Sequence, residues 1–383
     1  MDIDLNNYHY AFEILEGNRI NLYITTILGF ALASTVSSKS MERIRKPESD
    51  TRAIAMLICC IMAIMVGFRP VYAAWATDSS NYASSYLNLQ KSVFNPLYDN
   101  KLELGGEGEW GFALLAKACA PVMHVVVYFF VISLLYHMLH YNAIGRMFGK
   151  NALLALAFVI VNFDFASFSF NGLRNGLGCS FSILGLSYVI ENNKRSQIVG
   201  FFLMYVATTF HKSCFLPLAC AACTMFNNDT SLYIKFWIAS IFISLVAGGA
   251  VTSFFAGLGF DSRMDQYNQM QDDYALAGFK SGFRPDFLLF SALPIYFAHL
   301  SYNKLKIRDK RYQTLINTYI LANSFWVMVI RAAFSNRFAY LSWFMYGVVV
   351  AYPLIYHNIF QRQPQKVAFF LGAMTLFNLY MWF

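Results

Sequence analysis

The chain has 383 residues, of which 57% are hydrophobic, 18% aromatic and only 13% charged. Soluble domains carry roughly 25% charged residues, so this composition excludes an ordinary soluble globular protein. The net charge of +8 comes with no basic stripe on an aqueous domain and no base-reading motif, so we expect no nucleic-acid partner. The composition predicts a polytopic membrane protein that contacts membrane lipid.

Apolar segments follow one another along the chain, separated by short polar breaks. A helix that crosses roughly 30 Å of hydrocarbon needs about 20 mostly apolar residues. We therefore expect an all-α bundle of about eleven or twelve transmembrane helices. No repeat or linker marks a second domain, so we expect a single transmembrane domain over residues 1–383. The predicted spans cover residues 20–37, 53–71, 121–140, 151–168, 174–190, 197–212, 214–227, 234–256, 286–303, 314–331, 338–358 and 367–383.

Lysine and arginine cluster in some of these breaks and not in others. By the positive-inside rule, the basic breaks face the cytoplasm. The opposite, outer face then carries the two longest breaks, near residues 70–120 and 257–285, and we expect the functional site there. The basic clusters are Lys39–Arg52, Arg146 with Lys150, Lys194 with Arg195, Lys304–Arg311, and Arg362 with Lys366.

The predicted outer face also holds arginines, one at a time, at helix ends. A guanidinium binds phosphate oxygens bidentately and stays charged, so this set predicts a site for an anionic lipid-linked molecule with a pyrophosphate. The alternative for any single arginine is a side chain that snorkels to the lipid headgroups. The set comprises Arg69, Arg174, Arg263, Arg284, Arg331 and Arg337, and His211 lies on the same face.

Arg174 interrupts the apolar stretch FASFSFNGLRNGLGCSFSILGLSYV, residues 165–189. A charge in the middle of a span is costly. We therefore predict two spans that meet at a turn, Asn171–Gly172–Leu173, with Arg174 at the start of the second helix. The positive end of that helix dipole adds to the attraction for an anion.

Few residues on the predicted outer face can transfer protons. His211 ends an apolar run, and an imidazole can act as a base near neutral pH, although a structural role is the alternative. Asp164 lies deeper, so we expect it either to pair with an arginine or to act in catalysis. The candidates are Asp78, Tyr82, Glu107, Glu109, Asp164, His211, Asp261, Asp265, Tyr267, Asp272, Asp273 and Asp286.

No nucleotide-binding or serine-hydrolase motif occurs, and we expect neither a cofactor nor a metal. The seven cysteines lie mostly in apolar runs without metal-ligand spacing. We expect them to be packing residues and not a disulfide framework.

Several short motifs occur in a recognisable order. This order resembles the EpsG-like branch of the Wzy polysaccharide (O-antigen) polymerases, with its D-x-x-x-Y, E-P-G-F, I-R-Q-x-I-A and F-H-x-S patterns. Trp110 stands where proline is usual, Asn175 where glutamine is usual and Gly178 where alanine is usual, whereas Arg174 and His211 are kept. The segments are ATDSSNYASSY (76–86), EWGFALLAKA (109–118), LRNGLGCSF (173–181), ATTFHKSCFLPL (207–218), GFRPDFLLF (282–290) and RAAFSNRFAY (331–340).

The resemblance implies a GT-C-like, Wzy-like membrane glycosyltransferase of the bacterial inner membrane, with its active face in the periplasm. Such a polymerase joins undecaprenyl-pyrophosphate-linked oligosaccharide units into O-antigen or a related surface polysaccharide. A Wzz-like chain-length co-polymerase is the implied protein partner.

For such a polymerase, the expected catalytic residues are Arg174 for charge stabilisation and His211 as the base, with Asp78 as the competing base. Two other classes stay open. A flippase or other transporter for lipid-linked oligosaccharides would place charges along a path through the membrane. An O-antigen ligase would share the donor and transfer it to another acceptor. The expected residues for binding substrate and pyrophosphate are Arg69, Arg284, Arg331, Arg337, Tyr82 and Tyr267.

Overall fold

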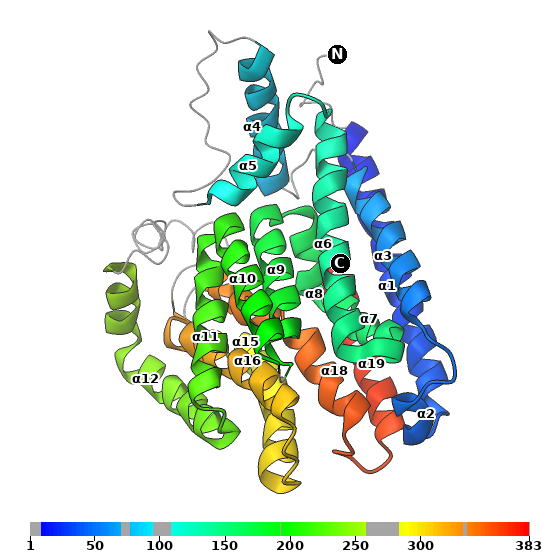
Figure 1. The fold of residues 1–383 in the computed structure, drawn as a ribbon, viewed down its shortest axis with the longest axis vertical. Helices are drawn as coiled ribbons and strands as arrows, with labels where there is room; N and C mark the ends of the chain where they lie inside the picture. The colour runs from blue at the N-terminus through cyan, green and yellow to red at the C-terminus, as the bar shows by residue number, and fades with distance from the viewer. Residues whose placement is uncertain are drawn as a thin grey trace. The chain divides into compact units, whose positions relative to one another are not determined.

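The computed structural model describes residues 9–69, 77–94, 109–191, 193–257, 283–331 and 335–382. Over these residues every regular element is a helix and no strand occurs, which confirms the expected all-α architecture (Figure 1). The helices group into two compact units. The first unit comprises Met1–Tyr188, Ile198–Cys214 and Arg362–Phe383, and the second comprises Val189–Gln197 and Phe215–Gln361. The single domain expected from the sequence stays a prediction.

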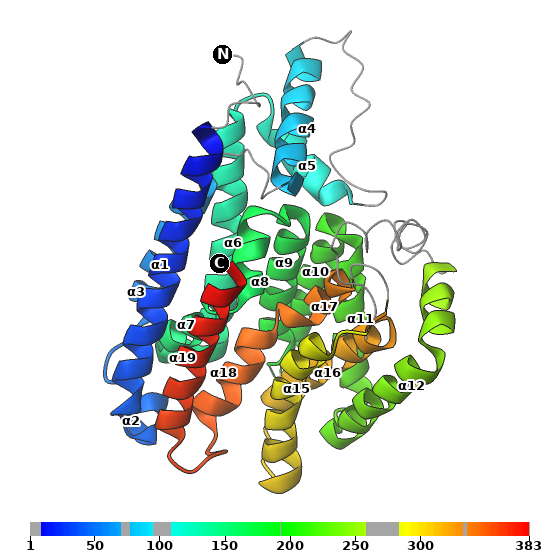
Figure 2. The ribbon, with the colours of Figure 1, turned by 180° about the vertical axis from the view of Figure 1, so that it is seen from behind.

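The first unit contains long apolar helices that pack along one another. They are α1 (His9–Ser37), α3 (Arg52–Gly67), α6 (Val125–Phe148) and α19 (Gln363–Trp382). Helix α1 lies beside α19, and α3 lies beside α6 (Figures 1 and 2). A Cβ atom on Gly67 would come 2.6 Å from the Cα of Phe130, so glycine allows α3 and α6 to touch at backbone distance.

Shorter helices complete the first unit. Helices α4 and α5 fall in the predicted outer break near residues 70–120, so the described part of this break is largely helical and is not an irregular loop. Residues 70–76 and 95–108 of that break, and residues 258–282 of the other, lie outside the described residues. The shorter helices are α2 (Met41–Arg45), α4 (Thr77–Phe94), α5 (Trp110–Cys119), α7 (Ala152–Ile160), α8 (Phe163–Phe170), α9 (Leu173–Val189) and most of α10 (Lys194–Phe210).

The second unit is built around α16 (Lys310–Met328), whose side chains from Tyr312 to Val327 are almost all buried. A helix whose side chains on all sides are either apolar or hydrogen-bonded belongs in the centre of a bundle. Its neighbours are α11 (Phe215–Phe226), α12 (Thr230–Gly257), α15 (Pro285–Ala298), α17 (Asn336–Trp343) and α18 (Tyr346–Tyr356).

Each predicted span coincides with helix in the structure. The predicted turn at Asn171–Leu173 is confirmed, because α8 ends at Phe170 and α9 begins at Leu173. Two predicted spans are each divided in two, and a third, 234–256, is kinked at Ala247 of α12. The span 151–168 breaks between α7 and α8, and the span 338–358 breaks between α17 and α18.

Three helical stretches among the described residues are long and apolar enough to cross a membrane by themselves. They are Val125–Ile160, Thr230–Ala250 and Arg337–Tyr356. Shorter apolar helices include Arg52–Gly67 and Lys212–Phe226. The fold is therefore an apolar helix bundle of the membrane type, whereas the number of crossings, about eleven or twelve from the sequence, stays a prediction.

A buried amide joins the helices of the second unit. Asn323 on α16 donates from Nδ2 to Ser291 Oγ of α15 at 3.1 Å and to Ser342 Oγ of α17 at 3.0 Å. Its Oδ1 accepts from Trp237 Nε1 of α12 at 2.8 Å. In an apolar interior, a satisfied network of this kind specifies how the helices pack.

Asn323→Leu is expected to lower the free energy of unfolding by about 1–3 kcal/mol, because Trp237 Nε1 would lose its partner in an apolar core. Ser324→Ala is the matched control, since Ser324 is equally buried on the same helix but donates only to the Ile320 carbonyl of that helix. Thermal unfolding of the two variants in detergent measures the difference. Equal destabilisation by both substitutions would contradict this role of Asn323.

Candidate functional site

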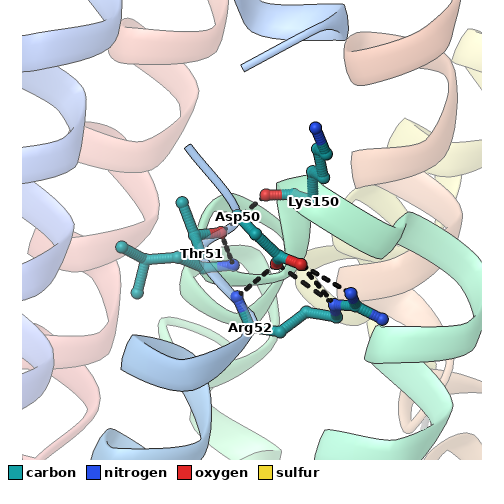
Figure 3. Close-up of polar contacts among 5 residues, drawn as sticks. Asp50, Thr51, Arg52 and Lys150 are labelled. Atoms are coloured by element: carbon teal, nitrogen blue, oxygen red, sulfur yellow. Dashed lines mark hydrogen bonds and ion pairs between the residues drawn. The ribbon is translucent and has the colours of Figure 1, made fainter. Parts of the chain in front are cut away.

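Basic residues gather at one end of the first unit. Thr51 Oγ1 donates to the carbonyl oxygen of Lys150 at 2.7 Å, and the side chain of Asn151 donates to the Arg45 carbonyl at 3.2 Å. Arg52, the first residue of α3, forms an ion pair with Asp50 at 2.5 Å (Figure 3). Two of the basic clusters recognised in the sequence, Lys39–Arg52 and Lys150, are thus brought together where α3 and α7 begin.

Arg69 lies just beyond the other end of α3 and is buried. Its guanidinium donates to the Val66 carbonyl at 2.6 Å, to Ser79 Oγ at 2.8 Å and, over a shorter distance, to the Phe170 carbonyl. All three acceptors belong to the protein. This geometry supports a structural role, in which Arg69 ties together α3, α4 and α8, and gives no support to the predicted role in substrate binding.

The centre of the candidate site is the carboxylate of Glu109, which directly precedes α5 and is 6% exposed. Its Oε2 forms a short ion pair with Arg174 Nη1. Its Oε1 accepts from His211 Nδ1 at 2.6 Å and from the backbone amide of Lys212 at 3.2 Å. One carboxylate therefore joins the start of α5, the start of α9 and the end of α10.

Tyr82 of α4 extends this cluster. Arg174 Nε donates to the Tyr82 hydroxyl at 3.1 Å, and the guanidinium carbon lies 5.7 Å from the centre of the tyrosine ring. The ring also packs against Phe112 of α5, with 5.3 Å between the ring centres. Burial raises the pKa of the Tyr82 hydroxyl, although the nearby Arg174 opposes that shift, so the phenol stays neutral near pH 7. Tyr82 thus contacts the arginine predicted to bind the substrate.

Asp78 lies one helical turn before Tyr82, on the same face of α4. It is half-buried, and its backbone amide donates to Asn171 Oδ1 of the turn before α9 at 3.2 Å. The cluster therefore combines one imidazole, one guanidinium and the Glu109 carboxylate, and Asp78 lies one turn away from Tyr82 on α4. Over the residues that the structure describes, no three His, Cys, Asp or Glu side chains group closely enough to hold a metal ion.

Close packing places His211 against α9. A Cβ atom on Gly178 would come 2.7 Å from Cys214 Sγ and 3.2 Å from His211 Cβ. Any larger residue would push the turn that carries His211 away from α9. Glycine at this position, where the motif usually has alanine, therefore brings the ends of α9 and α10 together.

The remaining predicted binding residues belong to the second unit or lie outside the described residues. Arg284 precedes α15, pairs with Asp286 at 2.6 Å and lies 3.7 Å from the centre of the Phe287 ring. Arg331 follows α16 and is exposed, and Arg337 is half-buried in the first turn of α17. Tyr267 and Arg263 lie outside the described residues.

Asp164 does not pair with an arginine in the described part of the chain. It is 2% exposed on α8, and its Oδ1 has no hydrogen-bond partner. The partner of Arg174 is Glu109, which the sequence had placed only among the proton-transfer candidates. The signal that could have found it is its position as the first residue of the motif EWGF.

The fold and the site together define a polytopic membrane protein with a largely buried acid–base cluster where several helices end. The chain belongs to the EpsG family, because the model of that family matches residues 52–383. The matched range contains every residue of the cluster, from Asp78 to His211, and confirms the resemblance drawn from the sequence motifs. The protein is thus a polysaccharide-related membrane protein. No curated protein and no solved structure matches the chain.

Proposed function

We propose that the protein is a polymerase that joins undecaprenyl-pyrophosphate-linked oligosaccharide units into O-antigen or a related surface polysaccharide. The observation that carries the proposal is the meeting of Arg174 and His211, from separate motifs, on the single carboxylate of Glu109. Transfer of a glycan from a lipid pyrophosphate requires a fixed positive charge for the leaving group and a base for the acceptor hydroxyl, and this pair of groups supplies both.

The proposed reaction is one displacement at the anomeric carbon of the donor glycan. The bond from this carbon to the pyrophosphate oxygen breaks, and the lipid pyrophosphate leaves with the electron pair. The hydroxyl oxygen of the acceptor unit forms the new glycosidic bond, and its proton passes to the base. The donor is already activated, so the reaction needs no nucleotide.

Arg174 stabilises the charge that develops on the departing pyrophosphate. The Arg174 side chain is 21% exposed, and its guanidinium is held in place by Tyr82 and Glu109. A preorganised cation of this kind acts on the transition state without having to reorganise. In the second unit, Arg331 and Arg337 are proposed to bind phosphate or acidic sugar groups, together with Arg284 and Tyr267.

His211 is the proposed base, and Asp78 is the competing candidate. Nδ1 of His211 is bonded to Glu109, which leaves Nε2 as the ring nitrogen that can take a proton from the acceptor hydroxyl. Asp78 lies one turn from Tyr82 and would act from α4.

We place the cluster on the periplasmic side of the bacterial inner membrane. This orientation is supported by the basic residues around Arg52 and Lys150 at the other end of α3 and α6, together with the positive-inside rule. On that side the protein would meet its lipid-linked substrate and a Wzz-like chain-length co-polymerase.

Loss of the gene is expected to leave single repeat units on the cell surface and to remove the polymer. Purified protein in lipid nanodiscs is expected to lengthen lipid-linked repeat units without added nucleotide. Complete absence of surface units would instead indicate a flippase or a ligase. Failure of the purified protein to lengthen lipid-linked units that are its natural substrate would contradict the proposal.

His211→Ala is expected to slow elongation by roughly 10²–10⁴-fold, the usual contribution of a general base. Asp78→Asn, measured in the same assay, distinguishes the two candidate bases, because only the variant that lacks the true base should show this decrease in the rate of elongation. His124→Asn is the matched control, since His124 is exposed at the start of α6 and asparagine preserves its capping interaction. Full activity of His211→Ala would remove His211 from the mechanism.

A further inference from the structure

The bond between Glu109 and His211 lies in a largely buried place. The exposed fraction is 7% for the Glu109 side chain and 15% for the His211 side chain, and Oε1 and Nδ1 are 2.6 Å apart. A carboxylate withdrawn from water to this extent is costly unless it is paired and hydrogen-bonded. Glu109 satisfies this condition with Arg174, His211 and the Lys212 amide.

Glu109 is already paired with a cation, so its hydrogen bond to His211 does not require a protonated histidine. Arg174 carries one positive charge and Glu109 one negative charge, and the two form a direct ion pair. The imidazole of His211 can therefore be neutral and still donate to Glu109, provided that its proton is on Nδ1. A neutral ring with its proton on Nδ1 has its lone pair on Nε2.

We propose that Glu109 is a positioning residue that holds His211 in the tautomer protonated at Nδ1 and directs Nε2 toward the acceptor hydroxyl. This inference rests on the proposed function, because it assumes that His211 is the base. During transfer, the hydroxyl proton moves to Nε2, and Glu109 stabilises the imidazolium that forms. A carboxylate bonded to the far nitrogen of a histidine has this effect in other enzymes, through orientation and charge and without accepting the proton itself.

The alternative is that Glu109 only ties α5, α9 and α10 together. In that case Glu109 would contribute to folding and substrate binding, and the effect of replacing Glu109 would be the same with or without His211. The two roles are separated by combining substitutions at Glu109 and His211.

Glu109→Gln is expected to lower kcat for elongation by roughly 10²–10⁴-fold, with KM for the lipid-linked donor unchanged. In the His211→Ala background, the same substitution is expected to cause a much smaller loss, because only the contact of Glu109 with Arg174 then remains to be lost. Glu48→Gln is the control, since Glu48 is exposed near the basic end of the unit and should change neither constant. An equal loss in both backgrounds, or a raised KM with unchanged kcat, would overturn the positioning role.

The tautomer can also be measured without any activity. In protein labelled with ¹⁵N-histidine, the His211 signals are those that disappear in His211→Gln. We expect the wild-type spectrum to show a proton on Nδ1 and an unprotonated Nε2, and we expect this preference to be lost in Glu109→Gln. A wild-type ring protonated at Nε2 alone would overturn the inference even if elongation is observed. The expected tautomer in a protein that fails to elongate would overturn only the proposed function.

Discussion

Arg174→Lys is expected to reduce the rate of elongation by about 10²–10³-fold, the usual loss when one preorganised donor is removed from a developing negative charge. Lysine keeps the positive charge but lacks the planar fork of donors. Arg174 donates to Tyr82 through Nε and to Glu109 through Nη1, so its orientation is set by two partners that a lysine cannot engage together. Single-turnover elongation of lipid-linked units in nanodiscs measures the effect.

The control for this prediction is Arg43→Lys, because Arg43 is an exposed residue at the basic end of the first unit. Thermal unfolding should confirm that both variants are folded, so that a lost rate can be assigned to the site. An Arg174→Lys protein with the full rate would show that charge alone is sufficient. An Arg174→Ala protein with the full rate would remove Arg174 from the mechanism.

Arg69→Met is expected to lower the free energy of unfolding by about 2–4 kcal/mol. The substitution removes the bonds to the carbonyls of Val66 and Phe170 and to Ser79, and it leaves the Val66 acceptor without this partner in a buried place. Methionine fills a similar volume, so the loss comes mainly from the hydrogen bonds and only slightly from a cavity. Thermal or denaturant unfolding of the detergent-solubilised protein measures it.

Arg52→Gln is the matched control for Arg69→Met. Arg52 begins α3, whereas Arg69 follows the end of this helix. The ion pair of Arg52 with Asp50 (Figure 3) involves exposed side chains, so no measurable change in stability is expected. Folded Arg69→Met protein should keep most of its specific activity. A variant with wild-type stability and no elongation would instead show that Arg69 binds the substrate, as the sequence had suggested.

The helices could be predicted from the sequence because apolar transfer energy is a local property of each segment. Each predicted span falls on helix, and the turn before Leu173 was predicted from the cost of placing Arg174 in mid-span. The breaks between α7 and α8 and between α17 and α18 could not be predicted in this way. Hydropathy alone marks neither break, although Asn162 directly before α8 and Asp164 in its first turn are polar residues of the kind that begin a helix.

The members of the candidate site were only partly predictable. Arg174, His211, Tyr82 and Asp78 were named from motif order and from their chemistry, and the structure brings them together. Glu109 was a candidate acid without an assigned place. Asp164 was a possible partner for Arg174 because it lies ten residues away, whereas the actual partner, Glu109, lies 65 residues away.

The sequence by itself determined that this chain is an apolar, all-helical membrane protein of the EpsG family, and that Arg174 and His211 lie where helices begin or end. These properties depend on composition, on the period of the segments and on short motifs. Only the tertiary structure decided which acid meets which cation. That choice made Glu109 the common partner of Arg174 and His211, and it gave the Arg69 guanidinium hydrogen bonds to protein oxygens. The physical reason is that an ion pair forms between groups close in space after packing, and sequence separation does not set that distance.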